Sequence, residues 1–116
     1  MPYSILGKNA MLNALGALAA YASLHTADPG ESGTNEVTGG SPAYARKAIT
    51  WNPAADGAMD DSNVPVFDVP AGTTVSYVGF WNAAGTVFYG YANVTDEVFA
   101  AQGTYTLTDA DLDLNA

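Results

Sequence analysis

The segment TTVSYVGFWNAAGTVFYGYANV, residues 73–94, decides the fold. Two runs rich in aromatic and β-branched residues, 74–81 and 86–94, flank a four-residue connection at 82–85. Gly85 closes this connection, and glycine tolerates the positive φ that a tight turn between strands requires. The pattern therefore predicts a β-hairpin.

Both faces of this hairpin carry large apolar side chains. On the first strand, Val75, Tyr77 and Trp81 fall on one side, and Val78 and Phe80 fall on the other. A strand that is apolar on both faces lies between two layers or has one face on a partner. We therefore expect the hairpin at the centre of the domain.

Runs of strand-forming residues separated by turn residues continue through most of the chain. Further strands are expected over residues 21–26, 43–51, 64–69, 104–108 and 111–115. Glycine, proline and polar residues dominate 28–42 and 52–63, which predicts two long surface loops. Proline has no N–H group to donate to a neighbouring strand. Pro65 and Pro70 therefore indicate that the strand over 64–69 lies at a sheet edge, or that these prolines mark the strand ends.

One short helix is expected before the strands, over residues 9–20, with Ser4 or Asn9 as its cap. Its apolar residues recur at helical spacing, namely Met11, Leu12, Leu15, Leu18 and Ala19. The predicted fold is mostly β: residues 1–116 form a single-domain β-sandwich, jelly-roll or Greek-key-like, with this N-terminal helix.

Charge and composition exclude several classes of function. The 116 residues include 3 Lys plus Arg and 12 Asp plus Glu, a formal net charge of -9, so nucleic acid and anionic membranes are repelled. The absence of cysteine excludes disulfides, zinc–thiolate sites and thiol catalysis. Residues 11–20 are apolar but follow no basic region, and no run reaches the roughly 18 residues of a membrane span. Neither a signal peptide nor a transmembrane helix is expected.

The single histidine, His25, forms an H-x-x-D pair with Asp28. A transition-metal site usually takes three or four ligands, and no second histidine is present to supply one. A Ser-His-Asp triad can be drawn from Ser23 or Ser41, but the chain contains no G-x-S-x-G nucleophile elbow. We interpret His25 as a strand-end histidine that is hydrogen-bonded or solvated.

The segment TDADLDLNA imitates the start of a calcium loop with Asp109, Asp111 and Asp113. An EF-hand loop needs glycine at its sixth position, where this segment has Leu114. Because these aspartates alternate with Leu112 and Leu114, a half-buried final strand explains the same residues. The sequence therefore assigns no catalytic residue, no metal and no cofactor, and an enzyme such as a cell-wall hydrolase is the least favoured class.

Arg46 and Lys47 are adjacent cations in an acidic chain. A lone arginine commonly makes a bidentate pair with a carboxylate, either within its own chain or across a subunit interface. We expect an assembly surface near this residue and the loop 28–42. Its candidate interface residues are His25, Asp28, Tyr44, Arg46, Trp81, Tyr89 and Tyr91.

Four motifs carry a resemblance to a known family: LHTADPG (24–30), AYAR (43–46), FDVPAGT (67–73) and GFW (79–81). Over residues 12–114 the chain resembles small virion proteins of tailed bacteriophages, described as minor tail or tail fibre proteins. The resemblance implies a structural component on the exterior of the phage particle. It carries over no catalytic residue.

Three hypotheses follow. The leading one is a non-enzymatic virion subunit that forms a homo-oligomer, for example a trimer, and docks onto other structural proteins of the tail. The first alternative is a capsid decoration protein bound to the major capsid protein. The second is a host-receptor or glycan-binding module whose aromatic side chains stack on sugar rings, with Tyr44, Trp51, Trp81, Tyr89 and Tyr91 as candidates.

Overall fold

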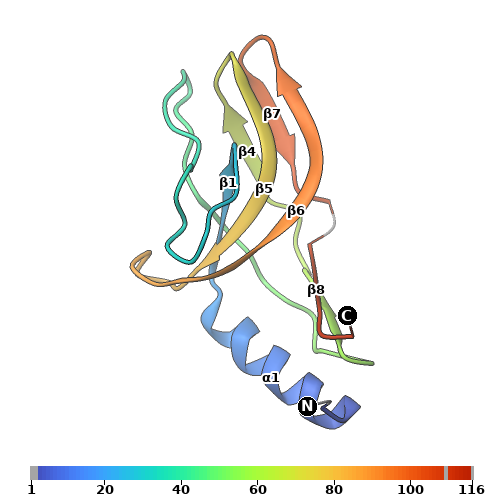
Figure 1. Ribbon diagram of the computed structural model, residues 1–116. Coiled ribbons are helices and arrows are strands. Elements are labelled where there is room, and N and C mark those ends of the chain that lie inside the picture. Colours follow the sequence, from blue (N-terminus) through green and yellow to red (C-terminus); the bar gives the residue numbers. More distant parts are fainter. Residues whose placement is uncertain (1–2, 109, 116) are drawn as a thin grey trace.

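A computed structural model describes residues 3–108 and 110–115. Within these residues the chain forms helix α1 (Ile5–Leu18) followed by eight strands (Figure 1). The strands are β1 (Tyr21–His25), β2 (Lys47–Ala48), β3 (Ala58–Asp60), β4 (Val66–Val69), β5 (Thr73–Trp81), β6 (Phe88–Phe99), β7 (Gly103–Thr106) and β8 (Asp111–Asp113). The prediction of a mostly β fold with a short N-terminal helix is confirmed.

The predicted hairpin, β5–β6, belongs to an antiparallel sheet of order β2-β1-β5-β6. Its pairing runs from Thr73 opposite Phe99 to Trp81 opposite Phe88. The second strand was expected to end at Val94 and instead continues to Phe99, because the first residues of β5 still supply backbone partners.

The hairpin turn spans residues 82–87 and is longer than the expected four residues. Asn82 holds the turn, because its Oδ1 accepts from the N–H groups of Thr86 at 2.9 Å and Val87 at 3.1 Å. Gly85 has a φ of 73°, the positive value expected for it. The asparagine therefore removes two β-branched residues from the strand that their residue types had predicted.

Three antiparallel pairs within the described residues are nested in the sequence: β5 with β6, β4 with β7, and β3 with β8. The chain from β3 to β8 therefore follows the path of one long hairpin whose arms bend between the pairs. In Figure 1 the β4–β7 pair lies behind β5 and β6, and the β3–β8 pair lies toward α1. The bends stack two sheets into a small β-sandwich.

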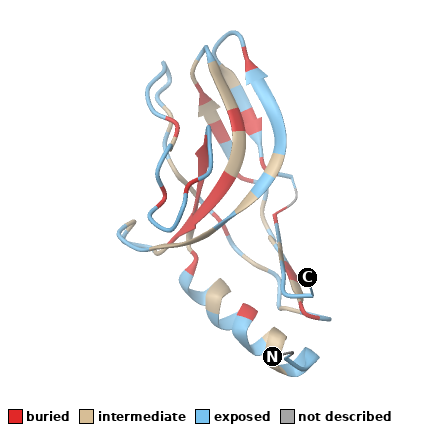
Figure 2. Ribbon diagram, viewed as in Figure 1, coloured by how far each residue is buried: buried red, intermediate tan, exposed pale blue. Residues whose placement is uncertain are grey.

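The core lies between the four-stranded sheet and the β4–β7 pair. Leu24 and Val75 reach it from the larger sheet, and Phe67 and Val69 reach it from β4; all four are fully buried. Figure 2 shows the buried residues concentrated along β1 and β5, whereas β6 and α1 are largely exposed. Burial between the two layers is therefore the main stabilising term for this fold.

Helix α1 begins at Ile5, four residues before its predicted start, because Ser4 and not Asn9 caps it. The Ser4 hydroxyl accepts from the N–H of Gly7 at 3.1 Å. The helix ends two residues before its predicted end, since the N–H of Ala20 already donates to the last residue of β5 at 2.9 Å.

The strand predicted over residues 43–51 is wrong for most of its length. Of this fully described segment, Lys47–Ala48 forms strand β2 at the sheet edge beside β1. Tyr44 and Arg46 turn their side chains toward Glu36 instead of following a ladder. These contacts with Glu36, in the preceding loop, override the alternation that suggested a longer strand.

The two predicted loops are more structured than expected. The loop over 52–63 contains strand β3, whose Met59 is buried and approaches α1 at Gly16. The loop over 28–42 buries Pro29 and Val37 and is not a surface loop throughout. The other predicted strands agree with β1, β4, β7 and β8 to within two residues at either end.

Candidate functional site

The loop after β1 covers the face of the four-stranded sheet that points away from the core. Residues 26–37 return along β1, where the N–H of Val37 donates to the carbonyl of Leu24 at 3.0 Å. Gly33 lies so close to the indole of Trp81 that a Cβ would be 2.5 Å from Cζ2. The Trp81 end of the hairpin therefore lies between two layers, one of the two arrangements expected for a strand that is apolar on both faces, whereas β6 stays largely exposed.

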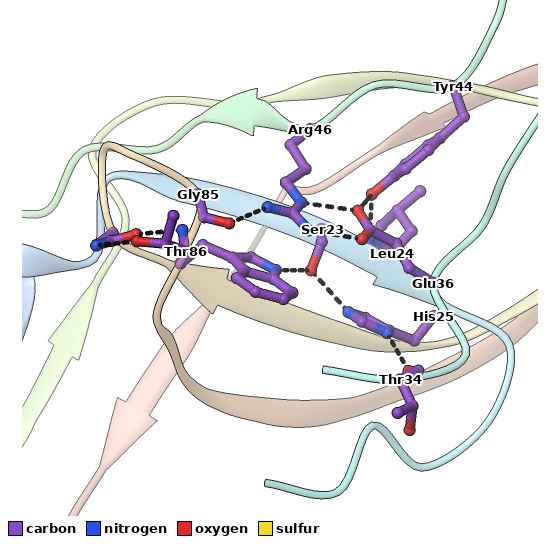
Figure 3. Close-up of polar contacts among 11 residues, drawn as sticks. Ser23, Leu24, His25, Thr34, Glu36, Tyr44, Arg46, Gly85 and Thr86 are labelled. Atoms are coloured by element: carbon purple, nitrogen blue, oxygen red, sulfur yellow. Dashed lines mark hydrogen bonds and ion pairs between the residues drawn. The ribbon is translucent and has the colours of Figure 1, made fainter. Parts of the chain in front are cut away.

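A chain of hydrogen bonds runs beneath this loop (Figure 3). Trp81 Nε1 donates to Ser23 Oγ at 2.8 Å, Ser23 Oγ lies 2.7 Å from His25 Nε2, and His25 Nδ1 lies 2.8 Å from the carbonyl of Thr34. A carbonyl only accepts, so Nδ1 carries the ring proton and Nε2 accepts from the Ser23 hydroxyl. Every member of the chain is satisfied in this tautomer.

The surroundings of His25 favour its neutral form. Burial lowers the pKa of His25 below its usual value of 6.5, against the opposing effect of the Thr34 carbonyl. The ring and Ser23 are both 0% exposed, so neither group meets solvent. The histidine is a hydrogen-bonded strand-end residue, as interpreted from the sequence, but it lies inside the chain and not on a surface.

The Ser-His-Asp triad considered from the sequence is not formed in the structure. The third partner of the histidine is the Thr34 carbonyl, and Asp28 instead accepts from the N–H of Gly30 at 2.8 Å within its own turn. A backbone carbonyl is not the buried carboxylate that stabilises an imidazolium in such triads. Ser23 and His25 therefore bind the sheet to the loop that covers it.

Arg46 lies at the centre of a second cluster on the same face of the sheet. Its Nε and Nη2 each donate to one carboxylate oxygen of Glu36 at 2.9 Å, and its Nη1 donates to the carbonyl of Gly85 at 3.1 Å. The guanidinium stacks 3.7 Å from the centroid of the Trp81 ring. The Tyr44 hydroxyl also donates to Glu36, at 2.8 Å. Of the two uses left open for this arginine, the structure therefore has the one within its own chain.

The electrostatics of this cluster favour an ionised carboxylate. Burial raises the pKa of Glu36, but the hydrogen bonds from Arg46 and Tyr44 outweigh it, and the net pKa is lowered. Burial raises the pKa of the Tyr44 phenol, which therefore stays protonated and able to donate. The Tyr44 hydroxyl also accepts from the N–H of Leu24 at 2.9 Å, so the cluster is tied to β1.

The remaining predicted interface residues lie at an open cavity of about 550 Å³ beside the hairpin. Tyr89 and Tyr91 line it together with Glu31. The Tyr91 ring is 43% exposed and packs edge to face on Tyr77 with centroids 5.7 Å apart. The negative charge of Asp28 raises the pKa of the Tyr91 phenol. The structure thus bonds His25, Tyr44, Arg46 and Trp81 within the chain, leaves Asp28 and Tyr91 exposed, and packs the half-buried Tyr89 against the core.

Of the C-terminal aspartates, the two that the structure describes form no cation site with other described residues. Asp109 lies outside the described residues, while Asp111 and Asp113 belong to β8 and pair with Asp60 and Ala58. Across residues 3–108 and 110–115, no group of three or more His, Asp or Glu side chains is arranged to hold a metal ion. Leu112 is half-buried, which agrees with the predicted half-buried final strand.

Comparison with known proteins identifies the family. Residues 5–114 match the family model of the podophage GP4 fiber I protein gp80. The chain belongs to this family. No curated protein and no solved structure matches it. The predicted resemblance to phage tail fibre proteins is confirmed by this match.

Membership of this fibre family makes the chain a structural component of the virion. Of the two locations left open by the sequence, the family favours the tail over the capsid surface. In the described part of this fibre protein, no helix is long and apolar enough to cross a membrane.

Helix α1 is the surface of the fibre protein that sequence reasoning missed. Its polar residues bond to their own chain: Lys8 Nζ donates to Asn115 Oδ1 at 2.8 Å, and Asn9 Oδ1 accepts from the N–H of Gly57 at 2.9 Å. On the other side, Leu6 is 82% exposed and Leu18 52%. The available signal was the lack of acidic residues before residue 28, which the net charge of the whole chain conceals.

Proposed function

We propose that this fibre protein is a small, non-enzymatic subunit on the exterior of the virion that oligomerises and docks onto other tail proteins. The observation that carries the proposal is the exposed apolar surface of α1. Monomeric soluble proteins rarely expose large contiguous apolar patches, and where they do the patch usually marks an interaction site. Leu6, Met11 and Leu18 provide such a surface at one end of the molecule.

The internal use of the reactive side chains supports the same proposal. Ser23 and His25 are buried and bonded to each other, and the Arg46 guanidinium is bonded to Glu36 and Gly85. Groups that are satisfied within the fold are not positioned to act on a substrate. The chain therefore acts through shape and buried area.

The proposal is tested by the mass of the purified protein in solution and by its binding to phage particles. We expect light scattering to give a defined oligomer, for which a trimer is one arrangement, and we expect the protein to bind to virions that lack this fibre. A protein that stays at its monomer mass of 11.9 kDa at high concentration and binds no virion component would contradict the proposal.

A glycan-binding role is the second candidate, favoured by the cavity beside the hairpin. Aromatic side chains beside a carboxylate are suited to stack on a sugar ring and accept from its hydroxyl groups. Tyr89, Tyr91 and Glu31 provide this combination. Calorimetry with bacterial surface polysaccharide tests it. Tyr91→Ala should abolish binding, whereas Tyr3→Ala, at a tyrosine of similar exposure on the helix end, should not.

A further inference from the structure

Helix α1 lacks the polar outer face that is usual for a surface helix. Such helices normally bury an apolar stripe and expose polar residues. In α1, which is described throughout, the exposed residues are Ile5, Leu6, Ala10, Met11, Asn13, Ala14, Ala17 and Leu18. Asn13 is the one polar residue of this set, and its Oδ1 already accepts from the N–H of Ala54 at 2.9 Å. The face of α1 that meets water is therefore apolar along the whole helix.

We propose that this exposed face of α1 packs against the α1 face of a second copy of the same chain. The inference rests on the proposed oligomerisation and names the surface that carries it. The opposite side of the helix is already used within the chain, because Leu12 is 2% exposed and Gly16 approaches Met59 and Trp51.

The distribution of charge favours a second copy as the partner. Each copy has a formal net charge of -9, so two copies repel each other over most of their surfaces. All 12 acidic residues lie from Asp28 onward, and the lysine within residues 1–27 is Lys8, which faces its own chain. The exposed face of α1 carries no charged side chain, so two such faces can meet without placing carboxylates directly opposite each other, while the exposed Asp56 and Asp60 of the neighbouring segment lie beside the helix.

The sizes of the side chains suit helix-to-helix packing. Small residues recur along the exposed face at spacings of four and three, namely Ala10, Ala14 and Ala17. Small side chains let two helix backbones approach, and larger neighbours fill the grooves between ridges. Leu6, Met11 and Leu18 flank the alanines and would lose most of their contact with water. Burial of this apolar area favours association.

The test introduces one charge at the middle of the face and compares it with the same charge elsewhere. Ala14→Glu and Ala14→Lys keep high helix propensity. Val98→Glu is the control, because Val98 is an exposed apolar residue on β6 with 72% exposure. Light scattering on the full-length chain should give an oligomer for the wild type and V98E, and the monomer mass of 11.9 kDa for A14E and A14K. Unchanged far-ultraviolet circular dichroism and a cooperative unfolding transition would establish that both position-14 variants fold, with a lower midpoint expected from the loss of association.

A mixture of A14E and A14K distinguishes contact between two copies of α1 from contact between α1 and a different partner. Across an α1–α1 contact the opposite charges of A14E and A14K attract, so the mixture should recover the wild-type mass at low salt. A mixture that stays monomeric while the wild type and V98E form oligomers would overturn the homotypic contact.

The failures of the two proposals are distinguishable. A wild-type protein that remains monomeric would overturn the proposed oligomerisation itself. An A14E variant with the full oligomeric mass would overturn the assignment to α1 and leave oligomerisation intact. Monomeric wild-type protein that binds neutral lipid vesicles, with binding lost in A14E, would assign the face to a lipid surface and overturn the inference.

Discussion

The guanidinium carbon of Arg46 lies 3.7 Å from the centroid of the Trp81 ring, and the same group holds both carboxylate oxygens of Glu36. A third hydrogen bond, at 3.1 Å, joins it to the carbonyl of Gly85. One side chain thus connects the loop over β1, the end of β5 and the hairpin turn. Arg46 is therefore the clamp that fastens the outer layer to the sheet.

Replacing this clamp with lysine should destabilise the protein. In Arg46→Lys a single ammonium cannot form the two parallel bonds to Glu36 or stack flat on Trp81. We expect the free energy of unfolding to fall by about 1–3 kcal/mol in urea denaturation at neutral pH. The matched change Lys47→Arg, next along the chain, should alter it by less than about 0.5 kcal/mol. Equal stabilities for R46K and the wild type would contradict the clamp.

The stability of the protein should depend on pH through its single histidine. Burial lowers the pKa of His25 in the folded state, so the unfolded chain binds more protons as the pH falls. The stabilising contribution of neutral His25 is therefore complete at pH values above the pKa of 6.5 in the unfolded chain. It is lost progressively as the pH drops toward the lowered pKa of the folded state. Denaturation curves between about pH 5 and 7 measure this slope.

The histidine effect can be separated from that of the carboxylates. The lowered pKa of Glu36 acts in a more acidic window, because its contribution is lost as the pH falls below its usual value of 4.5. His25→Gln should be less stable at neutral pH, and its stability should be nearly flat between about pH 5 and 7. An unchanged slope in H25Q would refute the assignment.

Gly79 should not tolerate a side chain. A Cβ at this position would lie 2.6 Å from Phe88 Cε1 and 2.7 Å from both His25 Nε2 and Ser23 Oγ. Gly79→Ala should lower the free energy of unfolding by about 1–3 kcal/mol, since the buried Ser23 and His25 and the half-buried Phe88 must shift. Gly7→Ala, within α1, should be neutral or stabilising by up to about 1 kcal/mol, because alanine favours the helix. If both alanines are tolerated alike, the close approach around Gly79 is wrong.

Removing the Ser23 hydroxyl should leave two buried partners without a hydrogen bond. In Ser23→Ala the Trp81 N–H and His25 Nε2 lose their common partner. We expect a loss of about 1–3 kcal/mol in the free energy of unfolding. Ser62→Ala removes an exposed hydrogen bond of 2.7 Å to Thr50 and should cost less than about 0.5 kcal/mol. Similar losses in S23A and S62A would argue against a buried chain of hydrogen bonds.

The local sequence pattern was sufficient to predict strands that pair with a neighbour close along the chain, and strands that are themselves strongly apolar. The hairpin β5–β6 follows from aromatic and β-branched runs, and β4 follows from a short apolar run beginning near Pro65. Strand β3 was missed, because Met59 is the single large apolar residue of a mostly polar segment and packs against α1. The strand predicted over 43–51 was too long. Its alternating pattern is present in the sequence, but Tyr44 and Arg46 form hydrogen bonds to Glu36.

The amino-acid sequence alone determined the mostly β fold, its central hairpin, the acidic charge and the resemblance to phage fibre proteins, because these depend on residue types and their local order. Only the tertiary structure decided which side chains are internal and which are exposed. His25 and Arg46 were candidates for an interface and bond within their own chain, while helix α1 turns Leu6 and Leu18 outward. The physical reason is that burial and pairing are properties of segments brought together from distant parts of the chain, which no local pattern records.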